Sequence, residues 1–184
     1  ASNIVPFALE LIRPGDVTSI ARSRIDMKLS VLDQSVAAAG RTQAQAITQT
    51  VELAALAESL GYHRFWVSEH HSHPSIVGTA PEVLMAALAT RTRNIRLGSA
   101  GVMLPHYSSL KVAEQFRVLE ALAPGRIDLG VGRAPGSDGR TAQLLNSDRY
   151  ASENFPQQVI DLYTWVTGGT PVSGQDRKST RLNS

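Results

Sequence analysis

The stretch Arg64-Phe65-Trp66-Val67-Ser68-Glu69-His70-His71 decides the fold predicted for this chain. It opens with strand-favouring apolar residues and ends in a carboxylate and two imidazoles. A buried strand that leads directly into ionisable side chains is typical of parallel α/β folds, in which the carboxyl ends of the strands carry the chemistry. The stretch therefore predicts a parallel strand with a functional site at its end.

Two later stretches have the same layout. A strand predicted at residues 95–102 contains the small pair Ala100-Gly101, and a strand predicted at residues 126–131 runs into the sequence Gly-Val-Gly-Arg at 130–133. A further strand is predicted earlier, at residues 28–33. Because three strands end in polar or glycine-rich sequence, we expect one site assembled from several strand ends.

Amphipathic helices are predicted after each of these strands. Apolar side chains recur at helical spacing in residues 46–60, 82–90, 109–123 and 156–167, and Thr42 is a candidate cap for the first helix. Residues 136–146 are predicted to be a polar loop. In the third helix the side chains expected to face inward are Leu110, Ala113, Phe116, Val118, Leu119 and Leu122.

Strict alternation of strands and helices predicts a parallel sheet with right-handed crossovers. We therefore predict an α/β fold, a (β/α)8 TIM barrel of which only about the first four β/α units are present. The length agrees, since 184 residues are short for a complete barrel of typically about 250. Four strands would leave two open edges and an exposed inner face, so this chain alone is expected to associate or aggregate and to lack activity.

Composition excludes several classes of protein. The net charge of +2 comes entirely from residues 176–184, so the rest of the chain is neutral and nucleic-acid binding has no support. The absence of cysteine excludes disulfides, thiolate metal sites and a cysteine nucleophile. No apolar run approaches the roughly 20 residues of a membrane span, and no signal peptide is evident. A cytoplasmic location is the expectation.

The two ends of the chain do not follow the strand and helix pattern. Met27 is the expected natural start, so residues 1–26 are interpreted as an N-terminal extension that is not native. Residues 176–184 resemble the translation of a common sequencing adapter and are interpreted as an artefactual tail. The predicted barrel domain therefore covers residues 27–175.

The residues at the strand ends admit more than one chemistry. His71 and His73 have a spacing that suits two ligands of one metal ion, although no further ligand is obvious, and they could equally be loop histidines without a role. Arg133 after Gly-x-Gly suits a phosphate, although a surface turn with a solvated arginine is the alternative. Ala100-Gly101 would leave room for a flat ligand against the backbone.

Four blocks together resemble the bacterial luciferase-like flavin monooxygenases. They are Trp66-Val67-Ser68-Glu69-His70-His71, the segment 97–105 (Leu-Gly-Ser-Ala-Gly-Val-Met-Leu-Pro), the segment 113–116 (Ala-Glu-Gln-Phe) and the segment 122–136, which contains Arg-Ile-Asp-Leu-Gly-Val-Gly-Arg-Ala-Pro-Gly. The resemblance extends from Met27 to about Thr167, and the order and spacing of the blocks make it specific.

The resemblance implies a barrel that binds reduced FMN (FMNH2) and oxidises a small organic substrate such as an aldehyde with O2. It implies that His70 is catalytic and that Glu69 orients the active-site network. It also implies that Arg133, after Gly132, contacts the flavin phosphate. The pair Ala100 and Gly101 would lie under the isoalloxazine ring, often joined by a cis peptide bond. Reduced flavin would come from a separate reductase, and the complete protein is expected to be a homo-oligomer.

Three alternatives are kept. A deazaflavin (F420)-dependent oxidoreductase would share the same barrel, and a metal-dependent barrel hydrolase would use the histidines as ligands, although no metal site is predicted. The third is a non-catalytic half-barrel that serves only as an interaction module.

Overall fold

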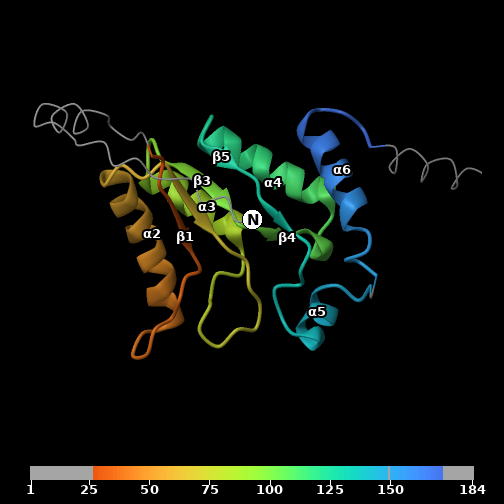
Figure 1. Cartoon of the computed structure of the whole chain (residues 1–184), viewed down its shortest axis with the longest axis horizontal. Helices are drawn as coiled ribbons and strands as arrows, with labels where there is room; N and C mark the ends of the chain where they lie inside the picture. Colours follow the sequence, from red (N-terminus) through yellow and green to blue (C-terminus); the bar gives the residue numbers. More distant parts are fainter. Residues whose placement is uncertain (1–26, 149, 172–184) are drawn as a thin grey trace, which may run out of the picture.

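The computed structural model describes residues 27–148 and 150–171 (Figure 1). The segments interpreted as an N-terminal extension and as an artefactual tail lie outside these described residues. Within them, strands and helices alternate along the chain in the order that the sequence predicts.

The core of the fold is a parallel sheet of four strands in the order β1-β2-β3-β5. In register, Leu32 of β1 lies beside Trp66, Trp66 beside Gly98, and Gly98 beside Asp128. The predicted parallel sheet is thus confirmed, and each strand neighbours the next along the chain. The strands are β1 (Ser30–Asp33), β2 (Arg64–Val67), β3 (Arg96–Ser99) and β5 (Ile127–Asp128).

Four helices form the outer layer, and each packs against the next along the chain. Figure 1 shows α2 and α6 at the two ends of this layer. The predicted cap Thr42 is confirmed: its side chain accepts from the amide of Gln45, whose own side chain accepts from the amide of Thr42. The helices are α2 (Gln43–Ser59), α3 (Pro81–Arg91), α4 (Ser109–Leu122) and α6 (Phe155–Val166).

The two faces of the sheet have different environments. Phe65, Val67 and Leu97 point outward and are completely buried against the helices. Arg64 and Trp66, which alternate with them along β2, point to the inner face and are only half-buried. Helices on one face of a parallel sheet are the arrangement of a (β/α)8 barrel, of which four β/α units are present here.

Two predicted strands are interrupted, so the predictions for residues 95–102 and 126–131 are partly wrong. β3 stops at Ser99, and β4 (Val102–Met103) instead pairs in parallel with β6 (Val131–Gly132) in a second, two-stranded sheet. At the break the backbones approach so closely that a Cβ on Gly130 would collide with the carbonyl oxygen of Ser99. The Ser99 hydroxyl bonds to both polar groups of Gly130 there (2.8 and 3.1 Å).

Two further predictions are corrected by the structure. Leu110, Val118 and Leu122 were expected to face inward, but they are exposed, because the buried stripe of α4 is rotated. That stripe consists of Ser109, Val112, Ala113, Phe116 and Leu119. The predicted polar loop 136–146 contains a short helix, α5 (Gly139–Leu145), which begins where the side chain of Asp138 accepts from two backbone amides.

A charged layer lies on the inner face, at the amino-terminal half of the strands. Asp128 accepts from Nε of Arg64 (3.0 Å) and from NH2 of Arg96 (2.5 Å). Burial opposes ionisation of Asp128, but the bonds from Arg96 and Arg64 outweigh it and hold the pKa of this carboxyl below its usual value. One carboxylate therefore ties together β2, β3 and β5.

We predict that Asp128→Asn lowers the free energy of unfolding by about 1–2 kcal/mol at pH 7, because two half-buried arginines lose their counter-charge. The folded-state pKa of Asp128 lies below its unfolded value. Its stabilisation is therefore present above about pH 4 and is lost as the pH falls through the folded-state value. Urea unfolding of both proteins between pH 3 and pH 7 measures this; equal stability at pH 7 would contradict it.

Candidate functional site

The carboxyl ends of the strands meet where the sequence predicts a site. The amide of Ala100 donates to the carbonyl oxygen of Val67 (2.8 Å), which ties the end of β3 to the end of β2. The amide of Val102 donates to the carbonyl of Gly130 (2.9 Å). The predicted segments 69–71, 100–101 and 132–133 are therefore brought to the same edge of the sheet.

The carboxylate of Glu69 is completely buried just beyond β2. Its Oε1 accepts from the hydroxyl of Tyr107 (2.6 Å) and lies 2.7 Å from Nε2 of His71, and its Oε2 accepts from the amide of Met103 (2.8 Å). A buried carboxylate persists only with such partners, since desolvation otherwise costs several kcal/mol. Glu69 thus joins the end of β2 to β4 and to the residue that follows the 3-10 helix η1 (Leu104–His106).

Tyr107 is a permanent donor in this network. Burial, and then the bond to Glu69, raise the pKa of the Tyr107 hydroxyl above its ordinary value. The hydroxyl therefore stays protonated at neutral pH and donates to the carboxylate. Because both carboxylate oxygens act as acceptors here, the His71 tautomer with a proton on Nε2 donates to Oε1 of Glu69, and this bond fixes the orientation of the ring.

The two neighbouring histidines have different surroundings. His71, the second of the pair, is the one that contacts Glu69. His70 is half-buried, and its Nδ1 lies 3.2 Å from the hydroxyl of Ser68. Glu69 therefore holds the histidine next to the one predicted to be catalytic. The imidazole of His73 instead accepts from the amides of its own loop, at Ser75 and Ile76.

The loop after β6 is fastened to this network through its backbone. The carbonyl of Gly136 accepts from the amide of His71 (2.9 Å), and the carbonyl of Pro135 lies 2.8 Å from Nε2 of His106. Gly136 has a φ of +61°, and a Cβ there would press on the carbonyl oxygen of Glu69 at 3.1 Å. The loop that carries Arg133 thus docks against the histidine block.

A hollow of about 540 Å³ lies on the inner face beside Ala100 and Gly101. The peptide bond between these two residues is cis, as the resemblance leads one to expect. A Cβ on Gly101 would come within 2.9 Å of the backbone of Gly130, so no larger residue fits there without movement. At Ala100-Gly101 the wall of the hollow is therefore backbone with one methyl group, which is a surface that suits a flat ring. The residues present fit a flavin ring in this respect.

The predicted phosphate contact lies at the neighbouring strand end. Gly132 ends β6 beside Met103, whose sulfur would lie 3.1 Å from an added Cβ. Arg133 follows and is exposed, with its Nε donating to the carbonyl of Ser152 (3.0 Å). This bond uses one of the five guanidinium donors and orients the side chain. Arg133 can therefore reach an anion from the solvent side.

The described residues provide no ligand set for a metal ion. Within residues 27–148 and 150–171, no group of three or more histidine, aspartate or glutamate side chains is placed to hold a metal ion. In the same residues, no helix is long and apolar enough to cross a membrane.

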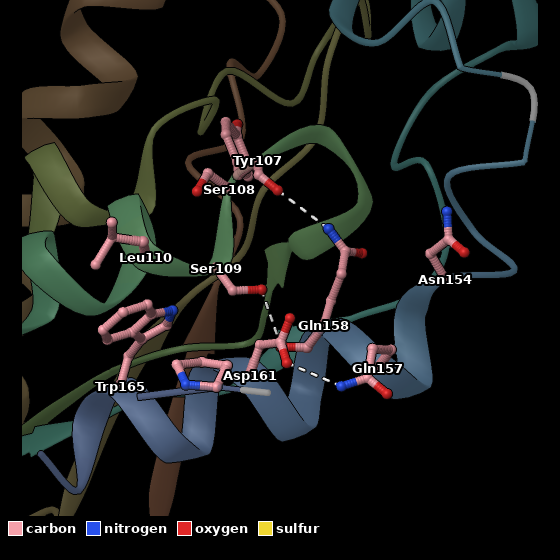
Figure 2. A pocket seen from close by; sticks show the side chains of 10 residues that line it. Tyr107, Ser108, Ser109, Leu110, Asn154, Gln157, Gln158, Asp161 and Trp165 are labelled. Carbon is pink, nitrogen blue, oxygen red and sulfur yellow. Dashed lines mark hydrogen bonds between the residues drawn. The ribbon is translucent and has the colours of Figure 1, made fainter. Parts of the chain in front are cut away.

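A second hollow, of about 480 Å³, lies between α6 and the start of α4 (Figure 2). Ser109 and the side chain of Gln158 cross it: the Ser109 hydroxyl donates to the carbonyl of Gln158 (2.9 Å), and Nε2 of Gln158 donates to the carbonyl of Tyr107 (3.1 Å). These bonds fasten α6 to the segment that contains Tyr107. The residues of this hollow thus hold α6 in place, and the hollow lies outside the predicted site.

Sequence reasoning missed Tyr107, His106 and Trp66. Tyr107 and His106 lie in a short loop after the third predicted strand, and their position at a strand end was the available signal. Trp66 was assigned only to a buried strand, because alternation along β2 does not say which face is the inner one.

We predict that Tyr107→Phe lowers the free energy of unfolding by about 1–3 kcal/mol, because the buried carboxylate of Glu69 loses one of its donors. Chemical denaturation at pH 7 measures the change. The matched control is Tyr163→Phe on α6, whose ring is exposed and whose loss of a hydroxyl should leave stability unchanged. Equal effects of the two substitutions would contradict the importance of the Glu69 network.

Comparison with known proteins identifies relatives over most of the described residues. A family model described as luciferase-like monooxygenase matches residues 27–146. The chain is 64% identical over 146 residues to the N-acetyl-S-alkylcysteine monooxygenase of Bacillus subtilis (strain 168). The aligned region covers 79% of this chain and 44% of that protein. The chain thus spans somewhat less than half the length of this curated relative.

Solved structures agree on the fold. Apo-MsnO8 superposes with a TM-score of 0.71 at 45% identity, over 76% of this chain and 42% of that one. The oxygenating component of 3,6-diketocamphane monooxygenase from Pseudomonas putida, in complex with FMN, has a TM-score of 0.67 at 23% identity, over 74% of this chain and 38% of that one. The second likeness concerns the fold alone.

Proposed function

Since the chain belongs to the luciferase-like monooxygenase family, we propose that it provides the first half of a flavin-dependent monooxygenase barrel that uses reduced FMN and O2. The observation that carries this proposal is the bare backbone hollow at Ala100-Gly101, with His70 and Arg133 on the adjoining strand ends. Such a reaction inserts one oxygen atom of O2 into an organic substrate and releases the other as water, with two electrons from the reduced flavin.

The residues of this chain have different proposed roles. Ala100 and Gly101 form the wall for the flavin ring, and Arg133 holds the phosphate through charge-assisted hydrogen bonds. His70 exchanges protons beside the ring, the role for which an imidazole with a donor and an acceptor nitrogen is suited. Glu69 is buried away from the hollow and acts by positioning, through His71 and Tyr107. A bound reduced flavin would be the group that reacts with O2.

The substrate is proposed at the level of a chemical class. The family resemblance suggests a small organic molecule such as an aldehyde. The 64% identity to an N-acetyl-S-alkylcysteine monooxygenase favours S-alkylated cysteine derivatives as the first compounds to test. O2-dependent consumption of one class and not of the other would decide between them.

The partners are proposed on the same basis. We propose a separate flavin reductase as the source of reduced FMN. We propose self-association of the complete protein, supported by an apolar hollow between α3 and α4 in which Val83, Val118 and Leu122 are exposed. The cytoplasmic location stays a prediction from the sequence.

Cofactor identity is tested by anaerobic titration of the protein with reduced FMN and, separately, with reduced deazaflavin. Saturable binding of reduced FMN is expected. Tight binding of the deazaflavin alone would replace the cofactor while keeping the barrel, and one stoichiometric zinc in a metal analysis would favour the hydrolase alternative.

We predict that Arg133→Ala weakens FMN binding about 10- to 100-fold, because the phosphate loses a charged donor. His70→Ala should leave binding largely intact and slow turnover about 100-fold or more. Binding is measured by equilibrium dialysis, and turnover in a protein completed with the C-terminal part of the Bacillus subtilis relative.

Arg140→Ala, at an exposed arginine of α5, is the matched control and should change neither quantity. Equal loss of FMN binding in the His70 and Arg133 variants would mean that the two roles are assigned wrongly.

A further inference from the structure

Trp66 lies on the inner face of β2 and crosses directly over its neighbour in register, Gly98. A Cβ added to Gly98 would lie 2.5 Å from Cδ1 and 2.6 Å from Nε1 of the indole. Real side chains do not approach so closely, so the indole can take this position only because residue 98 is glycine. The ring is thereby laid against the sheet instead of standing away from it.

The polar edge of this indole faces the charged layer. Nε1 lies 3.4 Å from Oδ2 of Asp128, the carboxylate that Arg64 and Arg96 also contact. A tryptophan with its N–H satisfied in this way has a fixed orientation and presents its apolar faces elsewhere. Trp66 thus lies beside Asp128 and borders the hollow that Ala100 and Gly101 also line.

Ala100 directly follows β3, two positions after Gly98, and so continues the inward-facing side of the strand, because side chains alternate between its two faces. The indole of Trp66 therefore lies one layer below the Ala100-Gly101 wall. All three residues line the same hollow of about 540 Å³. Arg64, Ser99 and residues 127–131 complete the lining, and Trp66 is its one aromatic side chain.

We propose that Trp66 is a flavin-contact residue, whose indole forms the floor on which the planar ring of the cofactor rests. This inference rests on the proposed function, because it takes the ligand of the hollow to be a flavin. It adds a role for Trp66, and for Gly98 as the residue that makes room for it. Aromatic contact with a planar ring contributes measurably to affinity and does not depend on the phosphate.

The test compares FMN with riboflavin, which has the same ring and no phosphate. Trp66→Leu should weaken binding of both ligands about 10-fold, whereas Arg133→Ala should weaken only that of FMN. The chain has two tryptophans, and Trp165 on α6 lines the separate hollow of Figure 2. Trp165→Phe is therefore the matched control and should bind both ligands as the unchanged protein does. Dissociation constants come from equilibrium dialysis, with circular dichroism to verify folding.

A second measurement leaves Trp66 in place. In the Trp165→Phe protein, Trp66 is the sole tryptophan, and saturating riboflavin should reduce its quenching by acrylamide at least twofold. Unchanged acrylamide quenching, or unchanged riboflavin affinity in a folded Trp66→Leu protein, would overturn the role of Trp66 while leaving the flavin assignment intact. Failure of the unchanged chain to bind either ligand would overturn both.

Discussion

The buried carboxylate of Glu69 is the interaction on which the predicted site depends. It contacts His71 in its own loop, and it accepts hydrogen bonds from two segments that are distant in sequence: β4, through the amide of Met103, and the residue after η1, through the hydroxyl of Tyr107. Each bond is strengthened by the low dielectric around it, and the loss of any one leaves a buried charge less well satisfied. The carboxyl edge of the sheet is therefore held by one ion with several donors rather than by apolar packing alone.

The inner face of the sheet is organised in layers that follow the strand register. Arg64 and Arg96 come first. The next row contains Trp66 and Gly98 together with Asp128, whose carboxylate both arginines contact, and the backbone wall at Ala100 follows. The outer face has no such layering, because Phe65, Val67 and Leu97 all pack into one apolar core with the helices. The polar side of the sheet thus carries the residues proposed to contact a ligand, while the apolar side packs into the core.

Local signals in the sequence were sufficient for the architecture. The alternation of strands and helices and the cap at Thr42 depend on neighbouring residues, and the structure confirms them. The break between β3 and β4 depends on how closely Gly130 approaches Ser99, which is a contact across 31 residues and leaves no local pattern. For the same reason the sequence grouped Glu69 with two histidines but could not say which one it holds. The exposed leucines of α4 were misassigned because helical spacing gives a stripe without fixing which part of it meets the core.

The separation between the ion-paired layer and the histidine block has a consequence for how such a protein can diversify. Arg64 and Arg96 begin their strands, whereas Ala100 and His70 follow the strand ends, about 13–20 Å further on at some 3.3 Å per residue. Substitutions confined to the histidine block therefore leave the ion pairs untouched, and their energetic effects should be nearly additive, whereas a change at Trp66 also affects Asp128. A scaffold with this division can accumulate substitutions that change its substrates while its stability stays above the level that folding requires. Under this condition one barrel can give rise to many specificities.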